Sequence, residues 1–135
     1  MRQKLLLLTL FISFLTISTF AQKTGILTVI ATYKGVLEGY DHICKTMVYI
    51  DGMLAGETSE LIQSEPNSCS ITVAQGKHNV RIVNMANYEG NWEEHTITNE
   101  YSIDALYESE IKLKNELTIN LVFDITEEKT FANLK

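Results

Sequence analysis

The sequence predicts an all-β protein, built as an antiparallel two-sheet β-sandwich with about seven strands. Short segments rich in β-branched and other apolar residues recur between residues 26 and 125, and several of them alternate with polar residues at a period of two. Turn-forming residues separate these segments at short intervals. No helical period of ordinary length lies between them, which disfavours an α/β fold.

The first 21 residues have the pattern of an export signal. Arg2 and Lys4 precede an uncharged apolar run over residues 5–17, and Thr19 and Ala21 are small residues two positions apart. We expect cleavage after Ala21, with an uncleaved N-terminal anchor as the alternative. The remaining residues 22–135 form a single β-sandwich domain on this reading. The protein would be exported, periplasmic or extracellular, and not inserted in a membrane once the signal is removed.

The first half of the domain contains three expected strands. Residues 26–33 place Leu27, Val29, Ala31 and Tyr33 on one face. Residues 45–50 form the next strand, and the pair Asp51-Gly52 supplies the positive φ that a tight hairpin turn needs. Residues 53–58 return as its short partner. Residues 34–43 and 59–68 are expected to be loops.

The second half adds further strands and one ambiguous segment. Residues 69–73 alternate, Gly76 permits a corner, and Val80 and Ile82 continue inward while Arg81 faces out. A turn follows at residues 87–91, and residues 92–98 alternate weakly. Residues 102–107 fit either one helical turn or an extended crossing between sheets, and Ile111 and Leu113 then alternate with lysines as another strand. Residues 117–125 have the clearest alternation, and the charged tail from residue 126 is expected to be loose.

The charge of the domain limits its partners. The chain has 11 basic and 17 acidic residues, and loss of Arg2 and Lys4 leaves a formal net charge of −8. An acidic surface repels phosphate backbones, so nucleic acid is excluded as a partner. No Lys or Arg occurs from residue 84 to residue 111. This acidic stretch is interpreted as a solvated face, with a calcium site as the alternative, although the spacing of a calcium loop is missing.

Two cysteines remain in the exported domain, Cys44 and Cys69. Because an exported chain leaves the reducing cytoplasm, the sequence predicts a disulfide between them. The alternative is a pair of buried thiols that pack as small apolar side chains.

Residues 48–83 resemble a known family. The run Val48-Tyr49-Ile50-Asp51-Gly52, then Gly56-Glu57-Thr58 and later Gly76-Lys77-His78-Asn79-Val80, is similar to the PEGA-type module. That family is a small immunoglobulin-like β-sandwich of bacterial envelope and surface proteins, related in style to carboxypeptidase-regulatory-like domains. The resemblance implies an extracytoplasmic structural or interaction domain without catalytic residues. The match ends near Asn84, so it implies the fold more than the role.

The candidate ligand surface lies beyond this match. Aromatic, acidic and imidazole side chains concentrate there, and tyrosine and tryptophan offer stacking faces with polar tips. A carbohydrate-binding module using Tyr88 and Trp92 is one hypothesis, and packing of these rings against the sandwich edge is the alternative. The candidate residues are Tyr88, Glu89, Trp92, Glu93, His95, Tyr101 and Tyr107.

Support for catalysis is weak. Glu93 and His95 would share one face of a strand, and His42 could complete a metal site, which gives a metal-dependent hydrolase as a further alternative. No second spaced pair of ligands, no Gly-x-Ser-x-Gly motif and no glycine-rich phosphate loop is present. We therefore expect an exported, non-enzymatic domain without cofactor or metal, whose partner is an envelope protein or a glycan.

Overall fold

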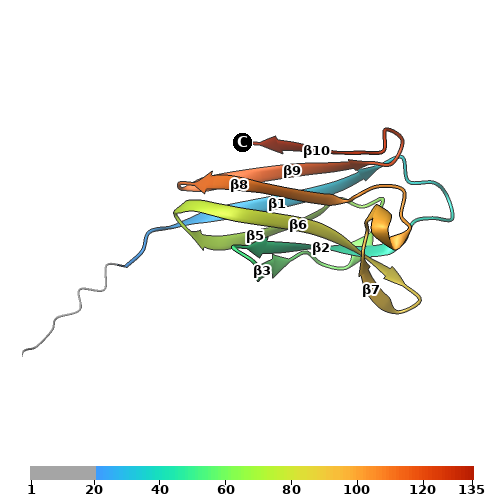
Figure 1. Cartoon of the computed structure of the whole chain (residues 1–135), viewed down its shortest axis with the longest axis horizontal. Helices are drawn as coiled ribbons and strands as arrows, with labels where there is room; N and C mark the ends of the chain where they lie inside the picture. The colour runs from blue at the N-terminus through green and yellow to red at the C-terminus, as the bar shows by residue number, and fades with distance from the viewer. Residues whose placement is uncertain (1–20) are drawn as a thin grey trace, which may run out of the picture.

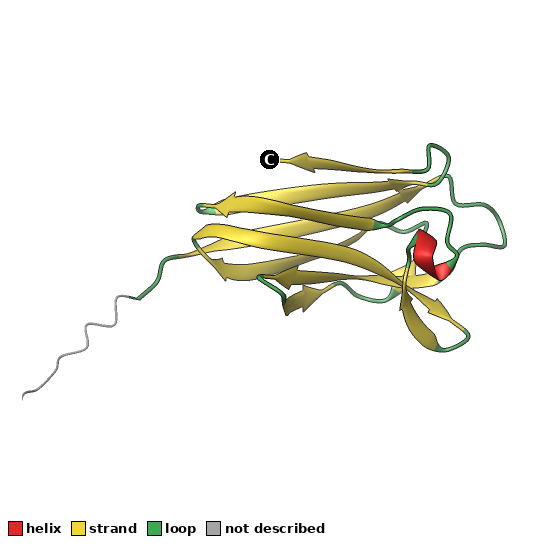
Figure 2. Ribbon diagram, viewed as in Figure 1, coloured by secondary structure: helices red, strands yellow, loops and turns green. Residues whose placement is uncertain are grey.

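The computed structural model describes residues 21–135 and is an all-β sandwich of two stacked sheets (Figures 1 and 2). The predicted signal peptide falls almost wholly outside these residues. The fold class is confirmed, with ten strands in place of about seven. The strands are β1 (Thr24–Lys34), β2 (Ile43–Ile50), β3 (Met53–Glu57), β4 (Leu61–Ile62), β5 (Asn67–Ala74), β6 (Gly76–Tyr88), β7 (Asn91–Glu94), β8 (Leu106–Leu113), β9 (Glu116–Asp124) and β10 (Lys129–Leu134). One 3-10 turn, η1 (Ile97–Asn99), lies between β7 and β8.

One sheet has four strands in the order β10-β9-β1-β5, and the other has the order β3-β2-β6-β7 with β4 beside β2 and β8 beside β6. Neighbouring strands are antiparallel with one exception. The strands β1 and β9 run parallel over residues 26–34 and 116–124. The first strand and one of the last therefore lie side by side in the middle of their sheet, which corrects the expectation of a purely antiparallel sandwich.

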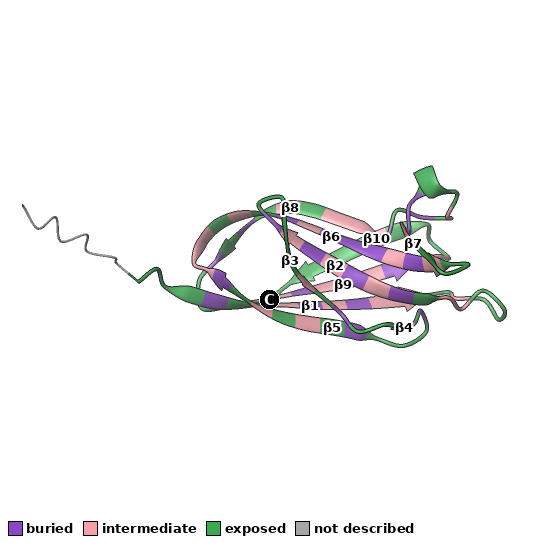
Figure 3. Ribbon diagram, turned by 90° about the horizontal axis from the view of Figure 1, so that it is seen from below, coloured by how far each residue is buried: buried purple, intermediate pink, exposed green. Residues whose placement is uncertain are grey.

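The core lies between the sheets and is built from the alternation that the sequence predicted (Figure 3). Inward side chains of both sheets are buried, and those between them along each strand are more exposed. Burial of this apolar surface is the main force that holds the two sheets together. The fully buried large apolar side chains include Leu27, Val29, Val48, Ile82, Val83, Ile103, Leu113, Ile119, Leu121 and Phe123.

The hairpin between β2 and β3 turns where the sequence predicted. Asp51 and Gly52 have φ values of 50° and 83°. Two successive positive φ values are the signature of a type I′ turn, whose twist matches that of the flanking strands. Glu89 and Gly90 repeat the arrangement between β6 and β7, with φ values of 49° and 87°.

Two expectations about the second half are settled. The segment between η1 and β8 forms no helix, and it joins two strands of the same sheet, so it is not a crossing between sheets. It carries Ile103 and Ala105 into the core. The expectation of a loose tail is wrong, because β10 pairs with β9 over residues 129–134. The polar residues of β10 face solvent at the edge of the sheet, so the hydrophobic pattern that marks an inner strand is weak there.

A candidate binding cleft at one end of the sandwich

The helical turn η1, the β6–β7 hairpin and the long loop between β1 and β2 lie at the same end of the sandwich (Figure 1). A cleft of about 810 Å³ opens between their side chains. This volume lies within the usual range of ligand pockets. The side chains around it in residues 21–135 are aromatic, aliphatic, hydroxyl, acidic, amide and imidazole, and none of them is Lys or Arg. The cleft is lined by Gly35, Val36, Leu37, Tyr40, His42, Gln63, Tyr88, Glu93, His95, Thr98, Asn99, Glu100, Tyr101, Ser102 and Ile125.

His95 is held in the wall of this cleft by a change of partner along β6. The strand β8 pairs with β6 as far as Val83, and β7 takes over from Met85. At the junction the Asn84 N–H donates to the Ala105 carbonyl at 2.9 Å, and the Asn84 carbonyl accepts from the His95 N–H at 2.9 Å. The Ala105 N–H donates to the His95 carbonyl at 2.8 Å. Three backbone bonds thus fix the position of His95.

The His95 ring is 3% exposed and packs between aromatic neighbours. The Tyr101 ring stacks on it with centroids 4.2 Å apart, and the Tyr33 ring lies tilted at 5.3 Å. The ring nitrogen Nδ1 lies 3.3 Å from Gln63 Nε2. The other nitrogen, Nε2, is the one buried side-chain nitrogen or oxygen in residues 21–135 that has no hydrogen-bond partner.

The surrounding bonds determine which His95 nitrogen carries the proton. The amide NH₂ group of Gln63 can only donate, so its contact with His95 Nδ1 makes that ring nitrogen the acceptor. Burial, and secondarily the nearby His42, lowers the His95 pKa from 6.5 to about 4. At neutral pH the ring is neutral, with its proton on Nε2.

Tyr101 and Glu93 form a second polar pair in the cleft. The Tyr101 hydroxyl donates to Glu93 Oε1 at 2.7 Å. Burial and this carboxylate raise the Tyr101 pKa, so the hydroxyl stays protonated. The bond fixes the ring that covers His95, and within residues 21–135 the second carboxylate oxygen of Glu93 has no partner.

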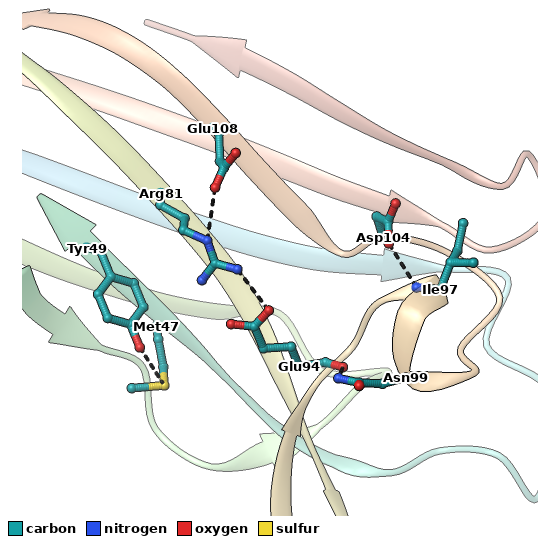
Figure 4. Close-up of polar contacts among 8 residues, drawn as sticks. All are labelled: Met47, Tyr49, Arg81, Glu94, Ile97, Asn99, Asp104 and Glu108. Atoms are coloured by element: carbon teal, nitrogen blue, oxygen red, sulfur yellow. Dashed lines mark hydrogen bonds and ion pairs between the residues drawn. The ribbon is translucent and has the colours of Figure 1, made fainter. Parts of the chain in front are cut away.

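The rim formed by η1 is tied back to the sandwich (Figure 4). The Ile97 N–H donates to Asp104 Oδ1 at 2.8 Å, and Asn99 Nδ2 donates to the Glu94 carbonyl at 2.8 Å. Glu100 follows in the left-handed region with φ of 67°, a conformation that costs free energy for a residue with a side chain. The strained residue faces the cleft, which is a common location for such strain.

The structure brings four of the seven candidate ligand residues to one place. Tyr88, Glu93, His95 and Tyr101 all line the cleft. The three others do not: Glu89 lies in the β6–β7 turn, Trp92 lies on the opposite face of β7, and Tyr107 packs against the core.

The separation of Tyr88 from Trp92 corrects the idea of a shared stacking platform. Tyr88 pairs with Asn91 and Trp92 pairs with Asn87, so the two rings lie on opposite faces of the hairpin. Lys45 Nζ lies 4.8 Å from the centre of the Trp92 ring. On the same outer face, Arg81 bonds to Glu94 at 2.8 Å and to Glu108 at 3.0 Å (Figure 4). Trp92 therefore belongs to an outer face whose cations already have partners.

Part of the cleft was not predicted from the sequence. Leu37 and Tyr40 lie in the loop between β1 and β2, both 66% exposed, and Gln63 is buried beside His95. Two apolar side chains in a loop with two glycines were a usable signal, because exposed apolar groups often mark interaction sites. Gln63 gave no such signal, since its role depends on a contact 32 residues away.

The geometry of the cleft does not support the hypothesis of a metal-dependent hydrolase. His42, Glu93 and His95 line the same cleft, but no group of three or more His, Cys, Asp or Glu side chains in residues 21–135 is placed to hold a metal ion. Over the same residues no helix has the length and apolar character required to cross a bilayer.

The two cysteines are separate thiols in the structure. Cys44 is buried in β2, and Cys69 is half-buried in β5 of the other sheet. Burial raises the pKa of both thiols, which makes them poor nucleophiles. The predicted disulfide is absent from this arrangement. Titration of thiols in the unfolded, non-reduced protein decides the matter, with two reactive thiols expected from the structure and none from the disulfide prediction.

No family model matches the chain, and no curated protein sequence matches it. Solved toxin structures align with 84% of the chain at low similarity. A Gram-negative toxin is 9% identical with a TM-score of 0.39, and a disulfide-locked mutant of intermedilysin with human CD59 is 13% identical with a TM-score of 0.38. Pneumolysin is 12% identical with a TM-score of 0.36. The chain covers 23–24% of these proteins, and a likeness this low supports no functional argument.

Proposed function

We propose that the chain is an exported, non-enzymatic β-sandwich domain that binds a partner protein of the bacterial envelope through the end cleft. One observation carries the proposal. His95 Nε2–H is a buried donor that has no acceptor within residues 21–135, and His95 lines a cleft rimmed by exposed tyrosines. An unsatisfied buried donor costs on the order of 1–3 kcal/mol, and an acceptor brought by a partner removes that cost.

Export is the reading that the first 21 residues favour, and it leaves residues 22–135 in the periplasm or outside the cell. The resemblance of residues 48–83 to PEGA-type modules fits the same proposal. On that view the resembling segment supplies the scaffold, and the cleft beyond it supplies the binding surface.

The chemistry of the cleft supports binding over catalysis. Within residues 21–135, the only hydrogen bond of the His95 ring is the one to Gln63, so no hydroxyl or thiol is placed for activation by this imidazole. A base that activates a nucleophile must reach it by a hydrogen bond. The buried, neutral ring is suited to donating a hydrogen bond to a bound group.

Site-specific photo-crosslinking in the native cell tests the proposal. The crosslinking amino acid p-benzoylphenylalanine replaces Tyr88, which is 56% exposed at the cleft, or Met53, which is 73% exposed in the β2–β3 hairpin. We expect one dominant protein adduct from position 88, absent from position 53 and lost when Tyr40→Ala is added. Equal adducts from both positions, or no protein adduct from position 88, would overturn the proposal.

A further inference from the structure

The charge and shape of the cleft identify the chemistry of the group that it binds. We propose that it takes an extended peptide segment whose Arg or Lys side chain lies against Tyr40 and Tyr88 and is paired with Glu93. This inference rests on the proposed function and specifies the partner's recognition element.

The charge of the lining residues favours a cation. Glu93 and Glu100 are the charged side chains of the cleft, and no Lys or Arg stands among its lining residues. The basic side chains of nearby strands are engaged elsewhere: Lys34 with Asp124 at 2.7 Å, Lys45 with Glu57 at 3.3 Å and Arg81 with two glutamates. A partner's cation is therefore the charge that the cleft lacks.

The exposed rings supply the second part of the recognition. Tyr40 and Tyr88 are 66% and 56% exposed on the cleft rim. Ring faces of tyrosine attract guanidinium and ammonium groups, and the attraction adds to that of a nearby carboxylate. Glu93 offers that carboxylate, with one oxygen held by Tyr101 and the other available.

His95 argues for a peptide rather than an isolated amine. Its Nε2–H requires an acceptor, which a cation cannot supply. A backbone carbonyl next to the cationic residue would meet this requirement. The volume of about 810 Å³ also exceeds what one side chain fills, which leaves room for flanking residues.

A glycan satisfies fewer of these features. It would accept from His95 and stack on tyrosine, but it carries no charge to match the two glutamates. Trp92, the ring best suited to sugar stacking, faces away from the cleft with Lys45 above it. The peptide is therefore favoured, and sugar binding becomes an outcome of the test.

Titration of the ¹⁵N-labelled protein, residues 22–135, tests the inference by amide chemical shifts. These residues contain every strand of the fold. The probes are acetyl-Gly-Arg-Gly-amide, its neutral isostere acetyl-Gly-citrulline-Gly-amide, and a β-1,4-linked glucose trisaccharide. We expect the arginine peptide to shift the amides of Tyr88, Glu93 and Tyr101. The citrulline peptide should bind roughly tenfold more weakly, because the charge-assisted bonds are lost.

Two variants separate the site from the surface charge. Glu93→Gln keeps an acceptor for Tyr101 but removes the charge, and should weaken arginine-peptide binding roughly fivefold to tenfold. Glu108→Gln removes an equal charge from the outer face, where Glu94 still holds Arg81, and should leave binding unchanged. Raising the salt from about 0.05 M to about 0.5 M should weaken binding of the arginine peptide.

Equal binding of the arginine and citrulline peptides would overturn the inference, as would saturable shifts at the cleft with the trisaccharide alone. A protein adduct from position 88 with no binding of the arginine peptide would leave the proposed function standing and reject this recognition element. Failure of the crosslinking test would reject the proposed function itself.

Discussion

His78, near the start of β6, and His95, which follows β7 and bonds to Asn84 of β6, illustrate how differently the two ends of the sandwich are completed. His78 donates from Nδ1 to Asp51 Oδ2 at 2.7 Å and from Nε2 to the Ala74 carbonyl at 2.7 Å. At the other end, the only hydrogen-bond partner of the His95 ring within residues 21–135 is Gln63, at Nδ1. The first arrangement favours a doubly protonated ring, and the second favours a neutral one.

The difference separates a structural corner from a binding end. Around His78, Asp51 also accepts from the Asn79 N–H at 2.9 Å, so the corner satisfies its own polar groups. Around His95, a buried donor and a carboxylate oxygen have no partner within residues 21–135. Residues 48–83, which resemble the PEGA-type module, contain the end of the sandwich around His78, called here the closed end. The candidate site lies mostly outside these residues.

The largest expected effect is the pH dependence of stability that His95 imposes. Its folded pKa of about 4 lies below the ordinary 6.5. Above pH 6.5 both states are neutral and the stability is complete; as the pH falls toward 4 only the unfolded state gains the proton, so stability is lost. The shift corresponds to about 3 kcal/mol. Urea unfolding at several pH values above 4 measures it.

The control for this pH dependence is His95→Phe, which cannot titrate and should unfold with a flatter pH profile between 6.5 and 4. If the unfolding free energy of the variant depends on pH as steeply as that of the wild type, groups other than His95 cause the dependence.

A somewhat smaller effect is expected from breaking the His95–Gln63 pair at pH 7. His95→Phe leaves the buried Gln63 amide without one acceptor, at a cost of about 1–3 kcal/mol of unfolding free energy, and it also removes the unpartnered Nε2–H, which offsets part of that cost. The added change Gln63→Leu should recover much of the loss, because replacing both members of a buried polar pair is close to neutral. If the double variant loses more unfolding free energy than the two single variants lose together, this account is contradicted.

Tyr101→Phe removes one hydroxyl bond and keeps the stacked ring. It should cost about 0.5–1.5 kcal/mol in denaturant unfolding, the usual contribution of one hydrogen bond. A larger loss would mean that the Glu93 bond, and not the ring contact, holds the segment over His95.

The smallest effect is expected at the closed end, with the opposite pH dependence. The bonds to Asp51 and Ala74 raise the His78 pKa. Its stabilisation is therefore complete below the unfolded pKa and disappears as the pH rises through the folded value. His78→Gln should lower the thermal midpoint more at pH 5.5 than at pH 8.5. Equal shifts at both pH values would show that the ion pair contributes nothing.

The strands were predictable from the sequence because they depend on local alternation. Leu27, Val29 and Phe123 each sit at a position that the period of two assigns to the core, and Asp51-Gly52 marks its own turn. The parallel pairing of β1 with β9 was not predictable in this way. It brings together segments about 90 residues apart, and no local pattern encodes which strands become neighbours.

The candidate site was predictable in composition more than in arrangement. Tyr88, Glu93, His95 and Tyr101 were identified as a surface, and they meet in the cleft. The register of β6 with β7 decides that Trp92 faces away, and a shift of one residue would reverse this. The unpartnered Nε2 of His95 depends on the packing of Gln63 and Tyr101 around the ring, which a pattern of residue types does not specify.

The direct test of the contrast between the two ends is the long-range ¹H–¹⁵N spectrum of the histidine rings, recorded from pH 4 to pH 8. The account predicts that His95 is neutral with its proton on Nε2 until the pH approaches 4, while His78 remains doubly protonated above the ordinary pKa of histidine. Titration of His95 near pH 6.5, or a proton on its Nδ1 at neutral pH, would contradict it.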